Sequence, residues 1–219
     1  MNNGKSDKAR RPLKVREVNI AQKIAAWLSA KNIHPNQISL ASIFFGFIAF
    51  LCFYLFRQDN ASIIFIIAAA VAIQGRLLCN LFDGMVAVEG GKSTPSGELF
   101  NDIPDRIVDP LILVGLGYAA TQFPINETLG WLAAILAVFT AYIRTLAASI
   151  GAPIDFSGPM AKQHRMAIST IACIVVAIEV VTLGSRWSLS IALWLIIAGS
   201  VLTAARRTLN AYQHLEQTK

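Results

Sequence analysis

The chain has 219 residues, of which 55% are hydrophobic and only 15% charged, and its formal net charge is +6. Soluble domains carry about 25% charged residues, so this composition excludes an ordinary soluble domain and indicates a membrane protein. A chain of this length is expected to form one compact domain.

Polar and basic residues dominate the first part of the chain. Eight of the 19 Lys and Arg fall within residues 1–36, and basic segments beside membrane spans stay in the cytoplasm. Within 15–31 the apolar residues recur at near-helical spacing, which predicts an amphipathic helix in the headgroup plane. A basic tail can also bind nucleic acid, but beside membrane spans attraction to anionic lipids is favoured. We therefore expect membrane lipids and no nucleic acid as partners of this segment.

Six apolar runs follow, close to the roughly 20 residues that a membrane-spanning helix needs. They are 37–56, 61–79, 107–122, 129–150, 166–183 and 187–205. The second and third are predicted to continue as helices to about Val88 and from about Gly97. A soluble all-α protein is a poor alternative, because its helices would carry one apolar stripe rather than being apolar all round.

The sequence thus predicts an all-α, polytopic membrane protein with a cytoplasmic segment over 1–36 and a six-span domain over 37–219. Six spans return the C-terminus to the side of the basic N-terminus. Both termini are expected in the cytoplasm, and the expected location is a bacterial inner membrane.

The stretch between the second and third runs combines acidic and amide side chains with small residues. On a helix, side chains spaced by three or four residues share one face. Two such stripes occur here. They are Asn80, Asp83, Gly84 and Ala87, and then Gly97, Asn101, Asp105 and Asp109. The connection VEGGKSTPS contains two Gly and one Pro, so two antiparallel helices are expected to bring the stripes face to face.

Oxygen ligands without His or Cys suit hard cations such as Mg²⁺, Mn²⁺ or Ca²⁺. Mg²⁺ in particular is often shared with a substrate phosphate. Several carboxylates at membrane depth are costly, so they need a cation or a water-filled cavity. The stripes therefore predict a divalent-metal site, with Mg²⁺ or Mn²⁺ as the cofactor.

The same stretch resembles the signature of the CDP-alcohol phosphotransferase (CDP-alcohol phosphatidyltransferase) family. That signature is Asp-x-x-Asp-Gly-x-x-Ala-Arg, eight to twelve residues, then Gly-x-x-x-Asp-x-x-x-Asp. Here it reads Asn80-x-x-Asp83-Gly84-x-x-Ala87-Val88, eight residues, then Gly97-x-x-x-Asn101-x-x-x-Asp105. The six spans, the interfacial helix, the HPNQIS start of the first span and the basic loop before the fifth are also similar to the family.

The resemblance implies an integral membrane enzyme of phospholipid biosynthesis. Such enzymes use an acceptor alcohol to displace CMP from a CDP-linked lipid, such as CDP-diacylglycerol, or from another CDP-alcohol. The family also implies a homodimer. The identity of the acceptor stays open.

Roles carried over from the family fall on individual residues. The resemblance implies that Asp83 is a metal ligand, and that Asp105 binds metal and is the general base acting on the acceptor hydroxyl. Residues expected to contact the CDP part of the substrate are Gly84, Ala87, Thr94, Gly97 and Asn36.

Three positions depart from the signature, with Asn80 and Asn101 in place of Asp and Val88 in place of Arg. Asn can still offer a carbonyl oxygen to a metal but brings no charge, so weaker metal binding is expected. Asp102 is a further candidate ligand, because Pro104 disturbs the helix locally. Arg76 or Arg106 could replace the missing Arg.

Basic residues before the fifth and at the end of the fourth run complete the predicted site. Lys162, Arg165 and Arg144 are expected to bind the acceptor's phosphate or an anionic headgroup. Ordinary positive flanking of a span is the alternative. Asp109 is predicted to be an ion-pair partner rather than a metal ligand.

Two other functions remain possible at this point. The substitutions at Asn80, Asn101 and Val88 are compatible with a catalytically silent relative that binds CDP-lipid or a partner. Intramembrane carboxylates also occur in small cation-coupled transporters, but those place their polar groups near the midplane. The polar stripes here gather toward one face, which favours the enzyme.

Overall fold

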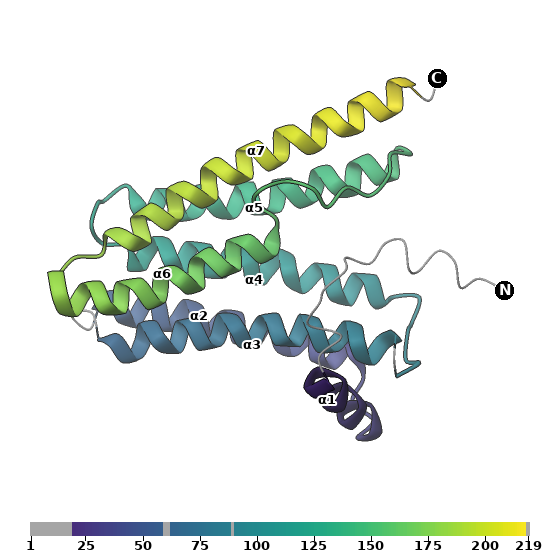
Figure 1. Cartoon of the computed structure of the whole chain (residues 1–219), viewed down its shortest axis with the longest axis horizontal. Coiled ribbons are helices and arrows are strands. Elements are labelled where there is room, and N and C mark those ends of the chain that lie inside the picture. The colour runs from purple at the N-terminus through teal and green to yellow at the C-terminus, as the bar shows by residue number, and fades with distance from the viewer. Residues whose placement is uncertain (1–18, 59–61, 89, 218–219) are drawn as a thin grey trace.

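The computed structural model describes residues 19–58, 62–88 and 90–217. These residues form seven helices and no strand (Figure 1). The helices are α1 (Asn19–Ala30), α2 (Pro35–Gln58), α3 (Ile63–Val88), α4 (Gly97–Ala119), α5 (Asn126–Ser149), α6 (Lys162–Leu183) and α7 (Trp187–Gln217). The all-α prediction is confirmed. Helix α1 covers most of the predicted amphipathic helix, whereas residues 1–18 of the basic tail lie outside the described part.

Five of these helices, α2, α3, α5, α6 and α7, are long and apolar enough to cross a membrane, as expected of a polytopic membrane protein. Helix α4 has 23 residues but is not among the five, because its N-terminal half is rich in charge. The charged residues of α4 are Glu98, Asp102, Asp105, Arg106 and Asp109, none of them beyond its middle turn. The six-span count therefore stays a prediction that depends on α4.

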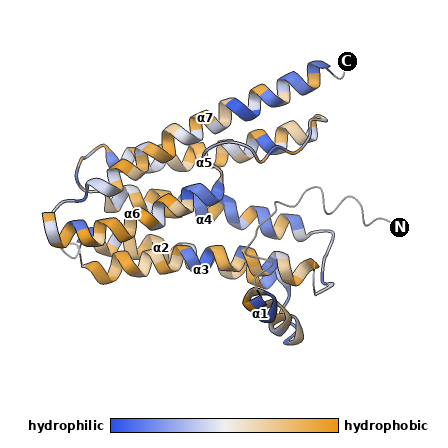
Figure 2. Cartoon of the chain, in the orientation of Figure 1, coloured by the Kyte–Doolittle hydropathy of each residue, from blue (hydrophilic) through white to orange (hydrophobic). Residues whose placement is uncertain are grey.

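The outward faces of the bundle are apolar, as lipid contact requires. Large side chains such as Phe44, Ile64 and Val181 are more than three-fifths exposed within the chain itself. Figure 2 shows the apolar colouring along most of the bundle, interrupted on the first turns of α4 and α6 and on the last turns of α7.

Helix α2 packs against both α3 and α4, α5 lies between α4 and α7, and α6 contacts α3 and α7. Small residues set the closest approach. A Cβ atom on Gly117 of α4 would lie 2.7 Å from the Cα atom of Gly130 in α5. Backbone contact of this kind is how membrane helices gain packing energy without a hydrophobic driving force.

The chain places its polar elements at one end of the bundle. In Figure 1, α1, the α3–α4 connection, the end of α5 and the end of α7 all lie at this end. The end of α2, the start of α3 and the α4–α5 and α6–α7 connections lie at the opposite end. Helix α6 begins near the middle of the bundle, so its first residues reach the charged half of α4.

Glu179 of α6 caps the start of α7. Its carboxylate accepts hydrogen bonds from the backbone N–H groups of Trp187 (2.6 Å) and Ser188 (3.0 Å), and from the Ser185 and Ser188 hydroxyls. The first N–H groups of a helix have no partner inside the helix, and a negative charge there is favourable. This acidic residue thus has a structural role at the end far from the signature.

Candidate active site

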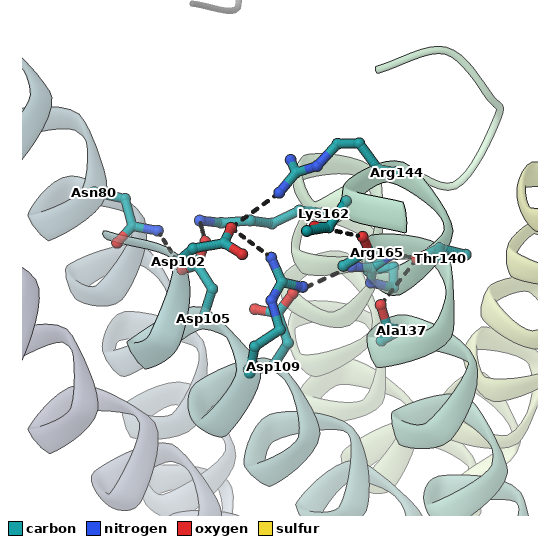
Figure 3. Close-up of polar contacts among 12 residues, drawn as sticks. Asn80, Asp102, Asp105, Asp109, Ala137, Thr140, Arg144, Lys162 and Arg165 are labelled. Atoms are coloured by element: carbon teal, nitrogen blue, oxygen red, sulfur yellow. Dashed lines mark hydrogen bonds and ion pairs between the residues drawn. The ribbon is translucent and has the colours of Figure 1, made fainter. Parts of the chain in front are cut away.

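A charged cluster joins α3, α4 and α6 inside the bundle (Figure 3). We use the name Asp105 cluster for the six side chains that bond to one another there. They are Arg76 and Asn80 of α3, Asp105 and Asp109 of α4, and Lys162 and Arg165 of α6. The predicted facing of the α3 and α4 stripes is therefore observed where Asn80 meets Asp105, and α6 is a third contributor.

Asp105 lies at the centre of this cluster and is only 5% exposed. Its Oδ1 atom accepts hydrogen bonds from Arg76 Nη2 at 2.8 Å and from Asn80 Nδ2 at 2.9 Å. Its Oδ2 atom pairs with the ammonium of Lys162. Both oxygens of the carboxylate are thus engaged, because a buried charge is stable only when it is paired and hydrogen-bonded.

Asp109 lies one helical turn further along α4 and is also buried. It pairs with Arg76 Nη2 at 2.5 Å and with Arg165 Nη2 at 3.2 Å. Arg165 also donates to the carbonyl oxygen of Met160 at 2.9 Å. The prediction that Asp109 is an ion-pair partner is confirmed. Arg165 is held in the same group of contacts, between Asp109 and the Met160 carbonyl oxygen.

Arg76 connects the two carboxylates of α4. Of the two arginines considered as replacements for the missing signature Arg, it is the one that reaches Asp105, whereas Arg106 pairs with Asp102. Nothing in the spacing of the sequence distinguished the two. The packing of α3 beside α4 distinguishes them, because it brings Arg76 next to Asp105 although the two residues lie 29 positions apart in the chain.

Asp83 is buried on α3 and is held by α2. The Ser39 hydroxyl donates to its Oδ2 atom at 2.6 Å. Its Oδ1 atom is buried and has no hydrogen-bond partner among the described residues. No spacing in the sequence marks Ser39 as the partner of Asp83, because a contact across 44 residues leaves no local signal.

The remaining two candidate metal ligands lie outside this buried group. Asn101 is exposed on the first turns of α4. The side chain of Asp102 is 44% exposed, and its Oδ1 atom accepts from Arg106 at 2.8 Å and from Arg144 at 2.9 Å. The Arg144 guanidinium also lies over the ring of Phe156, 5.2 Å from its centroid. This second charged group forms the rim above the Asp105 cluster.

The residues expected to contact CDP lie at the polar end of the bundle. Gly84 and Ala87 are half-buried on the last turns of α3, and Asn36 is half-buried on the first turn of α2. Thr94 is exposed, and its carbonyl oxygen accepts a hydrogen bond from the N–H of Gly97 at 3.0 Å. All five thus lie at helix ends or in a connection at the polar end of the bundle.

Helix α1 supports this end of the site. Its buried residues Ala21 and Ala25 belong to one apolar cluster with Leu81 and Met85, which flank Asp83 on α3. Lys92, in the connection that leads to Thr94, donates to the Ser29 carbonyl oxygen at 2.8 Å. Helix α1 therefore holds both α3 and the α3–α4 connection.

A family model for CDP-alcohol phosphatidyltransferases matches residues 32–205. The chain therefore belongs to this family of CDP-alcohol phosphotransferases, membrane enzymes of phospholipid biosynthesis. A comparison with curated protein sequences finds no match.

Solved structures of phosphatidylinositol phosphate synthase (PgsA1) from Mycobacterium tuberculosis share the fold. The structure with CDP-DAG bound is 19% identical, with a TM-score of 0.70, and the match covers 89% of this chain and 94% of that one. The complex with manganese and citrate is 18% identical, with a TM-score of 0.70, covering 88% of each chain. The apo form is 19% identical, with a TM-score of 0.68, covering 87% and 95%.

The family depends on a divalent metal, and the oxygen donors of this chain can be compared with that requirement. Asp83 and Asp105 offer carboxylates and Asn80 an amide oxygen, a donor set that suits Mg²⁺ or Mn²⁺. The unpartnered Oδ1 atom of Asp83 is a buried oxygen that a cation would satisfy. Among the described residues, however, no three His, Cys, Asp or Glu side chains are grouped to hold a metal by themselves. The donors fit a metal that completes its shell with water or substrate oxygens.

Proposed function

We propose that the protein transfers a phosphatidyl group from CDP-diacylglycerol, or a phospho-alcohol from another CDP ester, to the hydroxyl of an acceptor alcohol. The observation that carries this proposal is the buried carboxylate of Asp105, which stands at the last signature position and faces the α3 stripe. Family membership and the shared fold supply the reaction class. One neighbour in the solved structures holds CDP-DAG, which supports this donor.

Asp105 is the general base in this proposal. It accepts the proton of the acceptor hydroxyl while the acceptor oxygen forms a bond to the phosphorus of the lipid phosphate. The bond from that phosphorus to the oxygen of CMP breaks, and CMP leaves. General-base catalysis of this kind contributes about 10²–10⁴-fold in rate.

Asp83, Asp105 and Asn80 would hold the divalent metal, with Asp102 and Asn101 as further candidates from the rim. When bound, Mg²⁺ or Mn²⁺ would neutralise charge on the pyrophosphate oxygens. Gly84, Ala87, Thr94, Gly97 and Asn36 would form the wall for the CDP group. Ser39 would keep the Asp83 carboxylate oriented.

The acceptor would bind beside α6. Lys162 and Arg144 are partly exposed and positively charged, as a phosphate or an anionic headgroup requires. Arg165 is nearly fully buried against Asp109, so we propose that it positions the start of α6, which carries Lys162. The proposed site opens to the cytoplasm of a bacterium, and a homodimer is the proposed assembly.

One observation favours a second candidate, a catalytically silent relative that binds CDP-lipid or a partner protein. In addition to the three departures from the signature, both oxygens of Asp105 are engaged by side chains of the protein itself. No comparable observation favours a cation-coupled transporter, because the charged groups of the Asp105 cluster are paired with one another.

CMP release by the purified protein tests the proposal. The assay supplies CDP-diacylglycerol, Mg²⁺ or Mn²⁺, and a panel of alcohols that includes glycerol phosphate, inositol phosphate and serine. We expect turnover with one acceptor, its loss in Asp105→Asn, and retained CDP-lipid binding by that variant. The matched control is Glu127→Gln at the opposite end of the bundle, which should keep turnover. Absence of turnover with every acceptor, together with CDP-lipid binding that is unchanged by Asp83→Ala, would favour the silent relative.

A further inference from the structure

We infer that Lys162 is a tethered cation that blocks Asp105, so that a divalent metal reaches this carboxylate only after Lys162 moves away. This inference rests on the proposed function in one respect: it takes the divalent metal to be the one that the transfer reaction uses. Its own evidence is the set of contacts around Asp105, together with the exposure of the groups that make them.

Both carboxylate oxygens of Asp105 already have cationic or amide donors of the chain as partners. Arg76 and Asn80 donate to Oδ1, and Lys162 pairs with Oδ2. Asn80 stands at a signature position where the family has Asp. Here it gives an N–H to Asp105 instead of adding a second negative charge. Oδ1 already has two donors, and a metal at Oδ2 would lie next to the Lys162 ammonium, so the metal and a cationic donor of the chain compete for this carboxylate.

The three donors differ in their freedom to leave. The Arg76 side chain is 0% exposed, and its Nη2 atom is shared with Asp109. The Lys162 side chain is 26% exposed and belongs to the first residue of α6. A lysine carries a compact charge on a flexible stem, and Lys162 is partly exposed, whereas the Arg76 side chain is completely enclosed by the protein. Lys162 is thus the donor that can exchange with an incoming ion.

Charge balance supports the same assignment. With Asp83 included, the buried carboxylates are Asp83, Asp105 and Asp109, and the cations of the Asp105 cluster are Arg76, Lys162 and Arg165. Three negative groups face three positive ones, so the group as a whole offers a divalent ion no excess of negative charge. Removing the charge of Lys162 would create that excess next to Asp105.

Manganese binding in the absence of any CDP substrate tests the inference. Purified protein in lipid nanodiscs is titrated with Mn²⁺, and free Mn²⁺ is measured by electron paramagnetic resonance. We expect Lys162→Met to bind Mn²⁺ at least tenfold more tightly than the unaltered chain. Lys162→Arg, which keeps the charge, and Lys31→Met, which removes a lysine from the turn that follows α1, should stay within threefold of it.

A second measurement uses the unaltered chain and so does not depend on how the variant folds. Saturating Mn²⁺ should raise the labelling of Lys162 by a water-soluble amine reagent, as measured by mass spectrometry against Lys31 in the same sample. The inference is overturned if folded Lys162→Met gains no affinity, or if Mn²⁺ binds without changing Lys162 labelling. Neither measurement contains a CDP substrate, so a failure of the CMP-release assay would not change either result. Failure of this inference can therefore be told apart from failure of the proposed function.

Discussion

At the scale of single residues, Arg76 is the group on which the buried charges depend most. It is fully buried and pairs with both Asp105 and Asp109. Arg76→Met should lower the free energy of unfolding by about 3–5 kcal/mol, because removing one member of a buried ion pair leaves the other charge uncompensated. Thermal or denaturant unfolding in detergent measures this loss.

The matched control for that substitution is Arg57→Met. Arg57 pairs with Glu127 where the two side chains are 33% and 43% exposed, and exposed pairs contribute at most about 1 kcal/mol. Equal losses in the two variants would show that the network around Arg76 contributes little to stability.

The sequence predicted the buried residues of the site better than it predicted their partners. Asp83 and Asp105 follow from helical spacing, which is local information. Ser39 reaches Asp83 because α2 packs against α3, and Arg76 reaches Asp105 because α3 packs against α4. No spacing rule in the sequence predicts these contacts. Asn101 lies on the same stripe as Asp105, yet it is exposed. It lies one turn nearer the end of the bundle, where its neighbours Glu98 and Leu99 are exposed as well.

At the scale of helices, the α4–α5 contact depends on the absence of a side chain at Gly117. A Cβ atom there would also meet the backbone oxygen of Asn126 at 2.7 Å, and backbone atoms cannot rotate away. Gly117→Val should therefore destabilise the protein by about 1–3 kcal/mol, the usual cost of overpacking. The melting temperature of the purified protein measures the effect.

Gly97→Ala is the control for helix stability alone. A Cβ atom at Gly97 would meet only Thr94 Oγ1, at 3.5 Å, which is an ordinary contact. Alanine favours a helix over glycine by up to about 1 kcal/mol, so this variant should melt at the same temperature or higher. A fall as large as that of Gly117→Val would contradict the packing argument.

The cap on α7 gives a second prediction at this scale. Glu179→Ala should cost about 0.5–2 kcal/mol, the range for loss of an N-terminal cap. Faster amide hydrogen exchange at Trp187 and Ser188 would locate the loss at the start of α7. Glu179→Gln keeps one acceptor oxygen, so its stability should lie between that of the unaltered protein and that of Glu179→Ala. Unchanged exchange in Glu179→Ala would show that the carboxylate does not hold this helix end.

Helix positions were predictable because apolar runs and turn residues determine them locally. The predicted end of one helix at Val88 and start of the next at Gly97 are both confirmed. Helix α7 is longer than the predicted 187–205, since it continues to Gln217. Hydropathy marks the part of a helix that suits lipid and gives no signal for polar turns beyond it.

At the scale of the whole molecule, the number of spans decides on which side each end lies. If α4 crosses the membrane with the other five helices, the α3–α4 connection and the end of α7 share one side. In a variant without Cys52, Cys79 and Cys173, Ser96→Cys and His214→Cys should then react with an impermeant reagent from the same side. Thr121→Cys should react only from the other side. Labelling of Ser96→Cys and Thr121→Cys from one side would rule out α4 as a span.

The pairing of buried charges across three helices also has a consequence in time. Arg76 is synthesised 29 residues before Asp105 and 33 before Asp109, and Lys162 follows Asp105 by a further 57. Each charge is costly in lipid by itself, at least about 2.5–3.5 kcal/mol near the bilayer centre. Helices α3 and α4 are therefore expected to leave the insertion machinery together as a hairpin, before Lys162 and Arg165 of α6 can pair with their acidic groups. The order in which the helices enter the membrane would then follow the pairing of their charges. A chain that stops before α6 would keep unpaired acidic groups in the membrane, and we expect membrane quality-control proteases to degrade it.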